Sequence, residues 1–305
     1  MKRAIVTGAT GFIGSWLVQE LINNGVEVTV IVRDKRKFLH NLHNHQLVTI
    51  IEKQIESLQI CDFKTEFYDA FFHLAWSGVN PENKNDVALQ IQNIQMSLHT
   101  LEIAHKLGCK KYIATGTVAE FTQCDGVMDV NGRHTPNDIY GATKVATFYF
   151  LKIRSQQLGQ DFNWLILPST YGPRRTDNNI ITYTIKTFLN GQTPKYGSLT
   201  QMWDFLFVSD VARAIRLVAE KGKKNKVYGI GSSQYRPLKS YVEDIRDMID
   251  PDLKLNTSEQ KIGNKDTCSS CVNIYDITKD TGFQPSVSFA DGIKVTIDAF
   301  LQEQK

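Results

Sequence analysis

The sequence predicts an α/β fold: a doubly wound parallel sheet of the Rossmann type with a smaller C-terminal lobe that binds substrate. Three observations predict it. A short apolar run at residues 4–6 leads into a glycine-rich turn and then into apolar residues at helical spacing. Strand-like and helix-like segments alternate from there to residue 167. Beyond Pro168 the pattern changes to proline-containing loops. We therefore expect a dinucleotide-binding domain over 1–167 and about 208–231, and a substrate-binding lobe over 168–207 and 232–305.

The composition is that of an ordinary globular chain. Its 305 residues are 42% hydrophobic and 22% charged, and the formal net charge is +3. This charge is too small to indicate a nucleic-acid partner, and no dense Lys/Arg stripe is present. No apolar run is long enough to span a bilayer, and the N-terminus reads as a strand rather than a signal peptide. We expect a cytoplasmic enzyme with no membrane partner.

The sequence predicts no metal site. Among the five cysteines only Cys268 and Cys271 have ligand-like spacing, and one such pair without a second is poor support for zinc. His40, His43 and His45 lie among asparagines without a carboxylate or cysteine beside them, which favours a solvated polar loop.

The glycine-rich turn has the spacing G-x-x-G-x-x-G and lies between the first strand and a helix over residues 15–22. Glycines at these points let the backbone turn sharply, approach a pyrophosphate and pack the helix on the sheet. The helix N-terminus offers unpaired N–H groups to phosphates. An ordinary turn is the alternative, but the position between strand and helix favours a nucleotide site. We expect the cofactor to contact Gly8, Gly11, Phe12, Ile13 and Gly14.

The end of the second strand bears on which nicotinamide cofactor is expected. Residues 26–32 read as a parallel strand, and Arg33 follows at its carboxyl end, where the adenosine ribose of a cofactor lies in this fold. Arg33, with Arg36 and Lys37 close by, favours the 2′-phosphate of NADP(H). The alternative takes Asp34 as the acid that binds a ribose 2′-hydroxyl, and the cofactor is then NAD(H).

The next segments complete the predicted sheet. Strands are expected over 48–51, 69–76, 111–114 (running into 115–117) and 163–167. Helices are expected over about 85–107, ended by Gly108, and over about 140–158. In the lobe half we expect helices near 180–189 and 211–220 and an apolar segment at 227–230.

Tyr140 and Lys144 are the predicted chemical residues. Residues i and i+4 of a helix share a face, so the phenol and the ammonium can point into one cleft. A nearby cation lowers the pKa of a tyrosine and makes it a usable acid or base. Thr115 and Thr117, at the end of the preceding strand, offer hydroxyls to a carbonyl oxygen. The alternative is an amphipathic helix with an incidental Tyr/Lys pair, and the order of the motifs argues against it.

With these motifs the chain resembles the extended short-chain dehydrogenase/reductases that act on nucleotide sugars. The resemblance covers nearly the whole chain. It is carried by the stretches 7–14, 73–75, 171–173, 204–208 and 282–285, and by Asn93, Thr117, Tyr140, Lys144, Asn178 and Asn179.

The resemblance implies roles for particular residues. Thr117 is the Ser/Thr partner of Tyr140, since it lies four residues before Phe121, where family members carry the Tyr of a V-Y-G turn. Thr115 is the alternative. Lys144 also holds the nicotinamide ribose. Further cofactor contacts are expected at Leu74, Ala75, Thr115 and Pro168. Contacts with a nucleotide-diphosphate sugar are expected at Ser77, Thr117, Tyr140, Asn179, Gln201 and Trp203.

Departures from the family pattern narrow the expected reaction. Sugar 4,6-dehydratases follow the Thr with Asp-Glu, which act as acid and base in water loss, whereas Val118-Ala119 follow here. Combined epimerase-reductases place a Cys at the position of Ala119, which cannot move a proton. Trp203 stands where the family often has an arginine that meets the diphosphate. The candidate replacements for that arginine are Arg174, Arg175 and Arg236.

What remains is hydride transfer at a carbon that already bears oxygen. We expect an NADPH-dependent reductase of a nucleotide-linked 4-keto-6-deoxy sugar, in which Tyr140 protonates the oxygen. The alternative is an NAD-dependent nucleotide-sugar 4-epimerase. A non-catalytic NADP-binding sensor is a third interpretation, against which the intact Tyr140/Lys144 pair argues. The resemblance also implies a homodimer in which the helices over 85–107 and 140–158 form a four-helix bundle. Alternatively, these helices pack only on the sheet.

Overall fold

The computed structural model describes residues 1–38, 42–64, 67–122, 126–258 and 271–303. Its main sheet has seven strands, all parallel, in the order β11-β6-β5-β4-β1-β2-β3. The predicted doubly wound parallel sheet is confirmed. The strands are β1 (Arg3–Thr7), β2 (Glu27–Val32), β3 (Val48–Glu52), β4 (Ala70–His73), β5 (Lys111–Thr117), β6 (Asp161–Leu167) and β11 (Val227–Gly229).

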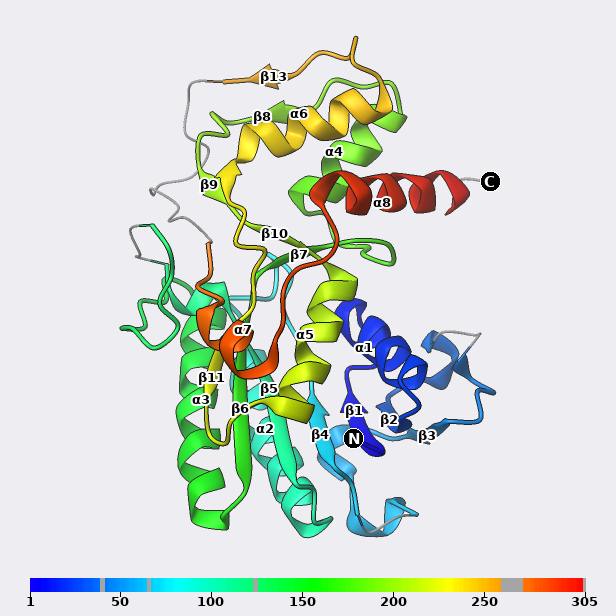
Figure 1. Cartoon of the computed structure of the whole chain (residues 1–305), viewed down its shortest axis with the longest axis vertical. Coiled ribbons are helices and arrows are strands. Elements are labelled where there is room, and N and C mark those ends of the chain that lie inside the picture. The colour runs from blue at the N-terminus through cyan, green and yellow to red at the C-terminus, as the bar shows by residue number, and fades with distance from the viewer. Residues whose placement is uncertain (39–41, 65–66, 123–125, 259–270, 304–305) are drawn as a thin grey trace.

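Helices cover both faces of this sheet (Figure 1). On one face lie α1 (Phe12–Asn23) and α5 (Val208–Lys221), and on the other lie α2 (Val87–Lys106) and α3 (Ile139–Leu158). Successive strand residues point to opposite faces. Val6 therefore packs in the core under α1 and α5, while Ile5 packs in the core under α2 and α3.

The two long helices begin at side-chain caps. An Asp86 carboxylate oxygen accepts a hydrogen bond from the Leu89 N–H at 3.1 Å, and Asp138 accepts one from the Gly141 N–H at 2.7 Å. Both aspartates satisfy N–H groups that a helix start leaves unpaired. At the other end of α3, Gly159 adopts a left-handed φ of 67°. The helices predicted over 85–107 and 140–158 are confirmed within two residues at each end.

Asp69 ties the start of β1 to the start of β4. Its carboxylate accepts hydrogen bonds from the Lys2 N–H at 2.6 Å and the Arg3 N–H at 3.1 Å, and from the Lys110 ammonium at 2.6 Å. Burial raises the pKa of Asp69, but these donors outweigh burial and bring the pKa down to about 2. The folded state therefore favours the charged carboxylate.

The strand order reverses at β1, which pairs with β2 on one side and with β4 on the other. Helices that leave the neighbouring strands at this point run to opposite faces, so a crevice opens outside the carboxyl ends of the strands. The glycine turn follows β1 at this crevice, and Leu74 follows β4. The topology therefore brings together the residues predicted to bind a dinucleotide.

A smaller lobe stands above the carboxyl edge of the sheet (Figure 1). Three two-stranded ladders join β7 (Ser169–Tyr171) to β10 (Phe205–Phe207), β9 (Met202–Trp203) to β12 (Arg236–Pro237), and β8 (Lys195–Tyr196) to β13 (Asn256–Thr257). The lobe helices are α4 (Ile180–Leu189), α6 (Leu238–Ile249) and α8 (Phe289–Glu303). Their apolar faces enclose a separate core.

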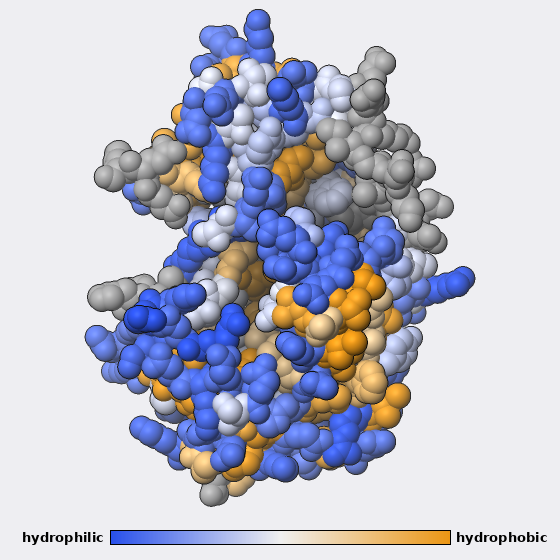
Figure 2. All heavy atoms as spheres, turned by 180° about the vertical axis from the view of Figure 1, so that it is seen from behind, coloured by the Kyte–Doolittle hydropathy of each residue, from blue (hydrophilic) through white to orange (hydrophobic). Residues whose placement is uncertain are grey.

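The outer surface of α2 and α3 carries several exposed apolar side chains. These side chains, which we call the α2–α3 face, are Val87, Ile91, Ile139, Tyr149, Phe150 and Ile153. A shallow cavity of about 530 Å³ lies on this face and is lined by Tyr149, Phe150 and Ile153 among others. Figure 2 shows orange surface gathered in the lower half of the molecule on the side of α3. Among the described residues, every helix is too short or too polar to cross a bilayer.

Candidate functional site

A cavity of about 780 Å³ lies between the carboxyl edge of the sheet and the lobe. It brings together most of the residues predicted from the sequence. The predicted residues that line it are Gly8, Gly11, Phe12, Ile13, Gly14, Leu74, Thr115, Thr117, Tyr140, Lys144, Pro168, Asn179 and Trp203.

The glycine turn is packed too closely for side chains. Gly8 has a left-handed φ of +74°, and a Cβ there would lie 2.7 Å from the Ala75 nitrogen. A Cβ on Gly14 would lie 2.0 Å from the Gly8 carbonyl oxygen. Helix α1 starts directly after Gly11, which has no side chain to cap the first N–H groups. These N–H groups face the cavity, so the turn fits the pyrophosphate of a dinucleotide.

The side chains after β2 include those predicted to distinguish NADP(H) from NAD(H). Arg33 is exposed and does not line the cavity. Asp34 caps the short 3₁₀ helix η1 (Lys35–Lys37) and accepts a hydrogen bond from the Arg36 Nε at 2.9 Å. This bond, with the Arg36 N–H, lowers the pKa of Asp34 to about 2. Arg36, predicted to help attract a 2′-phosphate, is thus paired with a carboxylate.

Tyr140 and Thr117 meet at the floor of the cavity. Thr117 ends β5, and its hydroxyl accepts a hydrogen bond from the Ala119 N–H at 3.2 Å. Burial raises the pKa of Tyr140 to about 12, although a hydrogen bond with Thr117 opposes the rise. The net shift is upward because desolvation of the phenol is the largest effect, whereas the sequence pattern predicted that the Lys144 cation would lower this pKa. Tyr140 is therefore protonated at neutral pH.

Lys144 is buried one helical turn from Tyr140. Its ammonium donates a hydrogen bond to the Thr115 carbonyl at 2.7 Å and lies 3.6 Å from the centre of the Trp76 ring. Burial lowers the pKa of Lys144, and the charge of Glu120 opposes this effect. Thr115 thus enters the site through its backbone carbonyl, which orients the ammonium.

Trp76 is a site residue that the sequence reasoning missed. Its ring meets the Tyr140 ring edge-on at 6.1 Å between centroids, and its indole N–H donates to the Gln90 side chain at 3.0 Å. The residue lines the cavity. Its place directly after Ala75, beyond the end of β4, was the available signal, since ligands bind at the carboxyl ends of strands.

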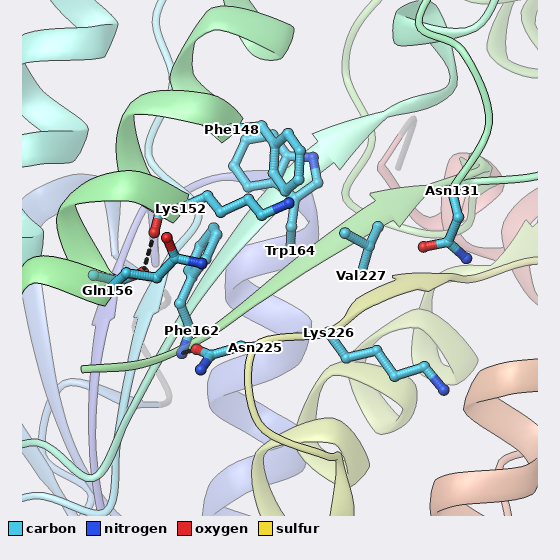
Figure 3. A pocket seen from close by; sticks show the side chains of 10 residues that line it. Asn131, Phe148, Lys152, Gln156, Phe162, Trp164, Asn225, Lys226 and Val227 are labelled. Atoms are coloured by element: carbon cyan, nitrogen blue, oxygen red, sulfur yellow. Dashed lines mark hydrogen bonds between the residues drawn. The ribbon is translucent and has the colours of Figure 1, made fainter. Parts of the chain in front are cut away.

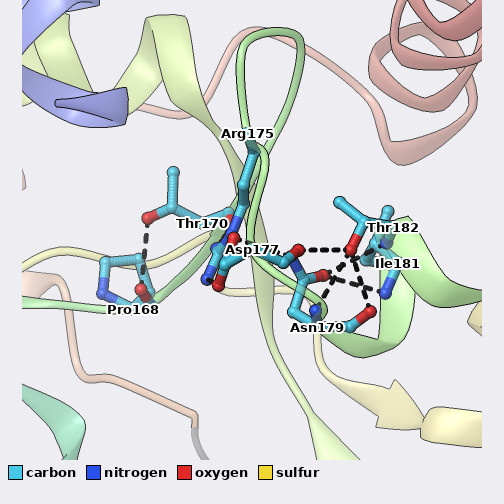
Figure 4. Close-up of polar contacts among 7 residues, drawn as sticks. All are labelled: Pro168, Thr170, Arg175, Asp177, Asn179, Ile181 and Thr182. Carbon is cyan, nitrogen blue, oxygen red and sulfur yellow. Dashed lines mark hydrogen bonds and ion pairs between the residues drawn. The ribbon is translucent and has the colours of Figure 1, made fainter. Parts of the chain in front are cut away.

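Two of the three candidate arginines line the cavity. Arg174 has a φ of 72°, its guanidinium stacks over Trp16 at 4.7 Å, and its buried Nη1 has no hydrogen-bond partner among the described residues. Arg175 forms an ion pair with Asp177, with an Nε–Oδ1 distance of 2.6 Å (Figure 4). Arg236 does not line this cavity and is paired with Asp244.

A second cavity of about 390 Å³ adjoins the first, and Asn179 and Trp203 line both. Gln201 lines only the second cavity. The Gln201 Oε1 and the Trp203 Nε1 are buried without a hydrogen-bond partner in the described chain. Asn179 caps α4, its Oδ1 accepting from the Ile181 N–H at 3.0 Å (Figure 4).

Ala75 and Ser77 support the site without lining the cavity. The Ala75 N–H donates to the Thr7 hydroxyl at 3.3 Å. The Ser77 N–H donates to the Asn93 Oδ1 at 2.8 Å, and the Asn93 amide returns a hydrogen bond to the Ser77 carbonyl at 3.0 Å. These bonds fix the loop that carries Trp76 into the cavity.

Other features of the described chain lie away from this cavity. A small cavity of about 160 Å³ lies between α3 and the edge of the sheet, lined by Phe148, Lys152, Trp164 and Lys226 among others (Figure 3). Within the described ranges, no group of three or more His, Cys, Asp or Glu side chains could hold a metal ion. His40 and Cys268 lie outside the described residues.

Comparisons with known proteins show which family the chain is similar to. The model of the NAD dependent epimerase/dehydratase family matches residues 4–231. A dTDP-glucose 4,6-dehydratase of Salmonella typhimurium is 27% identical over 335 residues, covering 98% of this chain and 92% of the relative. A UDP-N-acetyl-alpha-D-glucosaminuronate decarboxylase of Bacillus cytotoxicus is 27% identical to this chain, and the alignment covers 98% of each protein.

Solved structures agree in fold. The UDP-N-acetylglucosamine 4-epimerase of Methanobrevibacter ruminantium superposes with a TM-score of 0.88 at 25% identity, covering 99% of both chains. The UDP-glucuronic acid 4-epimerase of Bacillus cereus in complex with NAD superposes with a TM-score of 0.86 at 21% identity, covering both chains completely. The family model spans most of the chain, so this protein belongs to the NAD dependent epimerase/dehydratase family of extended short-chain dehydrogenase/reductases, enzymes of the nicotinamide-dependent oxidoreductase type.

Proposed function

We propose that this enzyme is an NADPH-dependent reductase of a nucleotide-linked 4-keto-6-deoxy sugar. The observation that carries the proposal is the apolar part of the lining of the cavity that also holds Tyr140, to which Trp76, Val79 and Val118 belong. Water loss, or inversion beside a ketone, needs an acid or base that moves a proton on carbon. None of these three side chains can do so. Hydride transfer at a carbon that bears oxygen needs only the phenol and its partners.

The protonation state of Tyr140 suits reduction. With its pKa raised to about 12, the phenol carries its proton at neutral pH and can donate it to the oxygen of a carbonyl. The Thr117 hydroxyl orients that oxygen. Lys144, fixed by the Thr115 carbonyl, would hold the ribose of the cofactor. A bound nicotinamide supplies the hydride.

The rest of the cavity suits a nucleotide-diphosphate sugar. The unpartnered Nη1 of Arg174 offers a donor to a diphosphate. The unpartnered Gln201 Oε1 and Trp203 Nε1 offer one acceptor and one donor to a nucleobase. The apolar side chains near Tyr140 favour a methyl group over a hydroxymethyl or a carboxylate at the sugar C6. The cofactor would occupy the part over 1–167 and 208–231, and the sugar nucleotide the lobe.

An NAD-dependent nucleotide-sugar 4-epimerase is the second candidate. Two observations favour it. The solved structures above are 4-epimerases, one of them in complex with NAD. The pairing of Arg36 with Asp34 also leaves Arg33 and Lys37, of the three predicted cations, for a 2′-phosphate. In a 4-epimerase the hydride leaves the sugar and returns to its other face, so no external reductant is consumed.

One experiment separates the two candidates. The purified chain is mixed with 4-keto-6-deoxy nucleotide sugars and NADPH or NADH, and separately with unmodified UDP- and dTDP-hexoses without added cofactor. A reductase oxidises one equivalent of NADPH for each keto-sugar reduced. A 4-epimerase interconverts the hexoses with no net change in nicotinamide. Interconversion of hexoses without reduction of any keto-sugar would refute the reductase.

We also propose that the enzyme is a homodimer joined through the α2–α3 face. The apolar side chains of this face include Phe150 and Ile153, each more than half exposed in the single chain. A contiguous apolar surface of this kind is typical of protein–protein interfaces. Two copies of α2 and α3 would then form a four-helix bundle.

A further inference from the structure

The structure buries a carboxylate that the proposed chemistry does not use. Glu120 belongs to the short helix η5 (Val118–Glu120), three residues after Thr117, and its exposed fraction is 0%. It does not line the 780 Å³ cavity. Its Oε1 accepts the Thr117 N–H at 2.9 Å, and its Oε2 accepts the indole N–H of Trp164 at 3.3 Å. One of these bonds holds the backbone of the residue that contacts Tyr140.

The titratable groups that face Glu120 come from α3 and from the loop before it. Lys144 and Tyr140, both on α3, interact with its charge. His134, in the loop before α3, brings its Nε2 to 3.7 Å from the Oε2 and packs against Phe121 at 4.8 Å between centroids. Burial lowers the pKa of His134, so the imidazole is neutral at neutral pH. Lys144 is therefore the cation that balances Glu120.

Glu120 and Lys144 stabilise each other's charged form across Trp164. The indole donates to Glu120, and its ring centre lies 5.7 Å from the Lys144 ammonium. Figure 3 shows Trp164 rising from β6 beside Phe148 of α3. Burial raises the pKa of Glu120 and lowers that of Lys144, and each partner's charge opposes the other's shift.

Two properties of a carboxylate are used at this place. Its two oxygens accept from two N–H groups, those of Thr117 and Trp164, whereas a glutamine side chain has only one acceptor oxygen. Its negative charge also interacts with the buried Lys144 ammonium.

We propose that Glu120 is a positioning residue for the reaction, which anchors the Thr117 backbone and serves as the counter-charge that keeps Lys144 protonated. This inference rests on the proposed roles of Tyr140 and Lys144. Without the negative charge, the ammonium loses its proton at a lower pH, and so does the Tyr140 phenol. As the pH rises, activity and cofactor affinity then fall at a lower pH than they do in the wild type.

The test compares Glu120→Gln with the wild type in the pH dependence of kcat/KM and of NADPH affinity, the latter followed by nicotinamide fluorescence. We expect the alkaline midpoint of both profiles to move down by roughly one pH unit. Glu120→Asp keeps the charge and should restore the midpoint toward the wild type. Glu27→Gln, exposed at the start of β2 on the edge of the sheet opposite the cavity, removes a carboxylate far from the cavity and should leave both profiles unchanged.

The outcomes separate this inference from the proposed function. A uniform loss of kcat/KM with unmoved midpoints would mean that Glu120 is merely structural, and the inference would be wrong. Binding of NADPH needs no sugar, so a shifted midpoint in its affinity supports the role of Glu120 even if no sugar nucleotide turns over. In that case only the proposed reaction fails.

A second variant covers the case in which Glu120→Gln does not fold. Trp164→Phe removes one hydrogen bond from the carboxylate, so it weakens the charged form of Glu120 and should move the midpoints in the same direction by less. Unmoved midpoints in a folded Trp164→Phe protein would overturn the inference.

Discussion

The closest packing in the proposed cofactor site gives a sharp test with Gly14→Ala. The new Cβ would lie 2.0 Å from the Gly8 carbonyl oxygen and 2.7 Å from its carbon. Non-bonded heavy atoms prefer separations of about 3.5 Å, so α1 and the turn must move apart by more than about 1 Å. Neither atom belongs to a flexible side chain that could turn away.

That movement has two expected costs. Overpacking of this kind destabilises a protein by about 1–3 kcal/mol. It also draws the first N–H groups of α1 away from the phosphates, and a displacement of about 1 Å in a binding site can cost roughly a hundredfold. We expect Gly14→Ala to unfold at lower urea concentration and to bind NADH and NADPH at least about tenfold more weakly.

Gly11→Ala is the matched control, since its Cβ would lie 3.2 Å from the same Gly8 oxygen. A few tenths of an ångström relieve this contact, so the urea midpoint of Gly11→Ala should stay close to that of the wild type. Urea unfolding and a fluorescence titration with reduced nicotinamide measure both variants. A Gly14→Ala protein with wild-type stability and wild-type cofactor affinity would refute the assignment of this turn.

Three further predictions concern the assembly, the sheet and the lobe. Ile153→Asp, on the α2–α3 face, should convert a dimer to a monomer in light scattering, whereas Val295→Asp, similarly exposed on α8, should not. Asp69→Asn should lower the free energy of unfolding by about 2 kcal/mol at pH 7. A carboxylate whose pKa is lowered to about 2 in the folded state stabilises the fold above about pH 4. Thermal unfolding should show the stability difference between the variant and the wild type shrinking as the pH falls toward about 2. A difference that stays constant with pH would contradict the prediction. Trp203→Ala should raise the KM for the sugar nucleotide roughly tenfold with NADPH affinity unchanged, and an equal loss of both would argue against a base contact.

Most of the sheet could be predicted from local patterns. Continuous apolar runs identified the buried parallel strands, and capping residues such as Asp86 and Asp138 lie where the predicted helices begin. In the C-terminal half α6 was missed, although Leu238, Tyr241, Val242 and Ile245 repeat at helical spacing. Short two-residue ladders such as β9 and β12 carry no periodic signal, because their pairing depends on tertiary contacts.

The sequence predicted most residues of the candidate site, but it did not predict their pKa shifts or ion pairs. The i, i+4 spacing predicted that Tyr140 and Lys144 share one helix face, and in the structure both line the cavity. The direction of the Tyr140 pKa shift follows from desolvation, which spacing cannot reveal. Charge along the sequence likewise favoured Arg36 as a phosphate ligand, but only the structure shows its pairing with Asp34.

The most direct test of the central claim is turnover of a 4-keto-6-deoxy nucleotide sugar by Tyr140→Phe, followed through NADPH oxidation. Phe keeps the ring beside Trp76 and removes only the proton donor. The mechanism predicts that kcat falls by roughly 10²–10⁴ while NADPH affinity stays near that of the wild type. A Tyr140→Phe enzyme with undiminished kcat would contradict it.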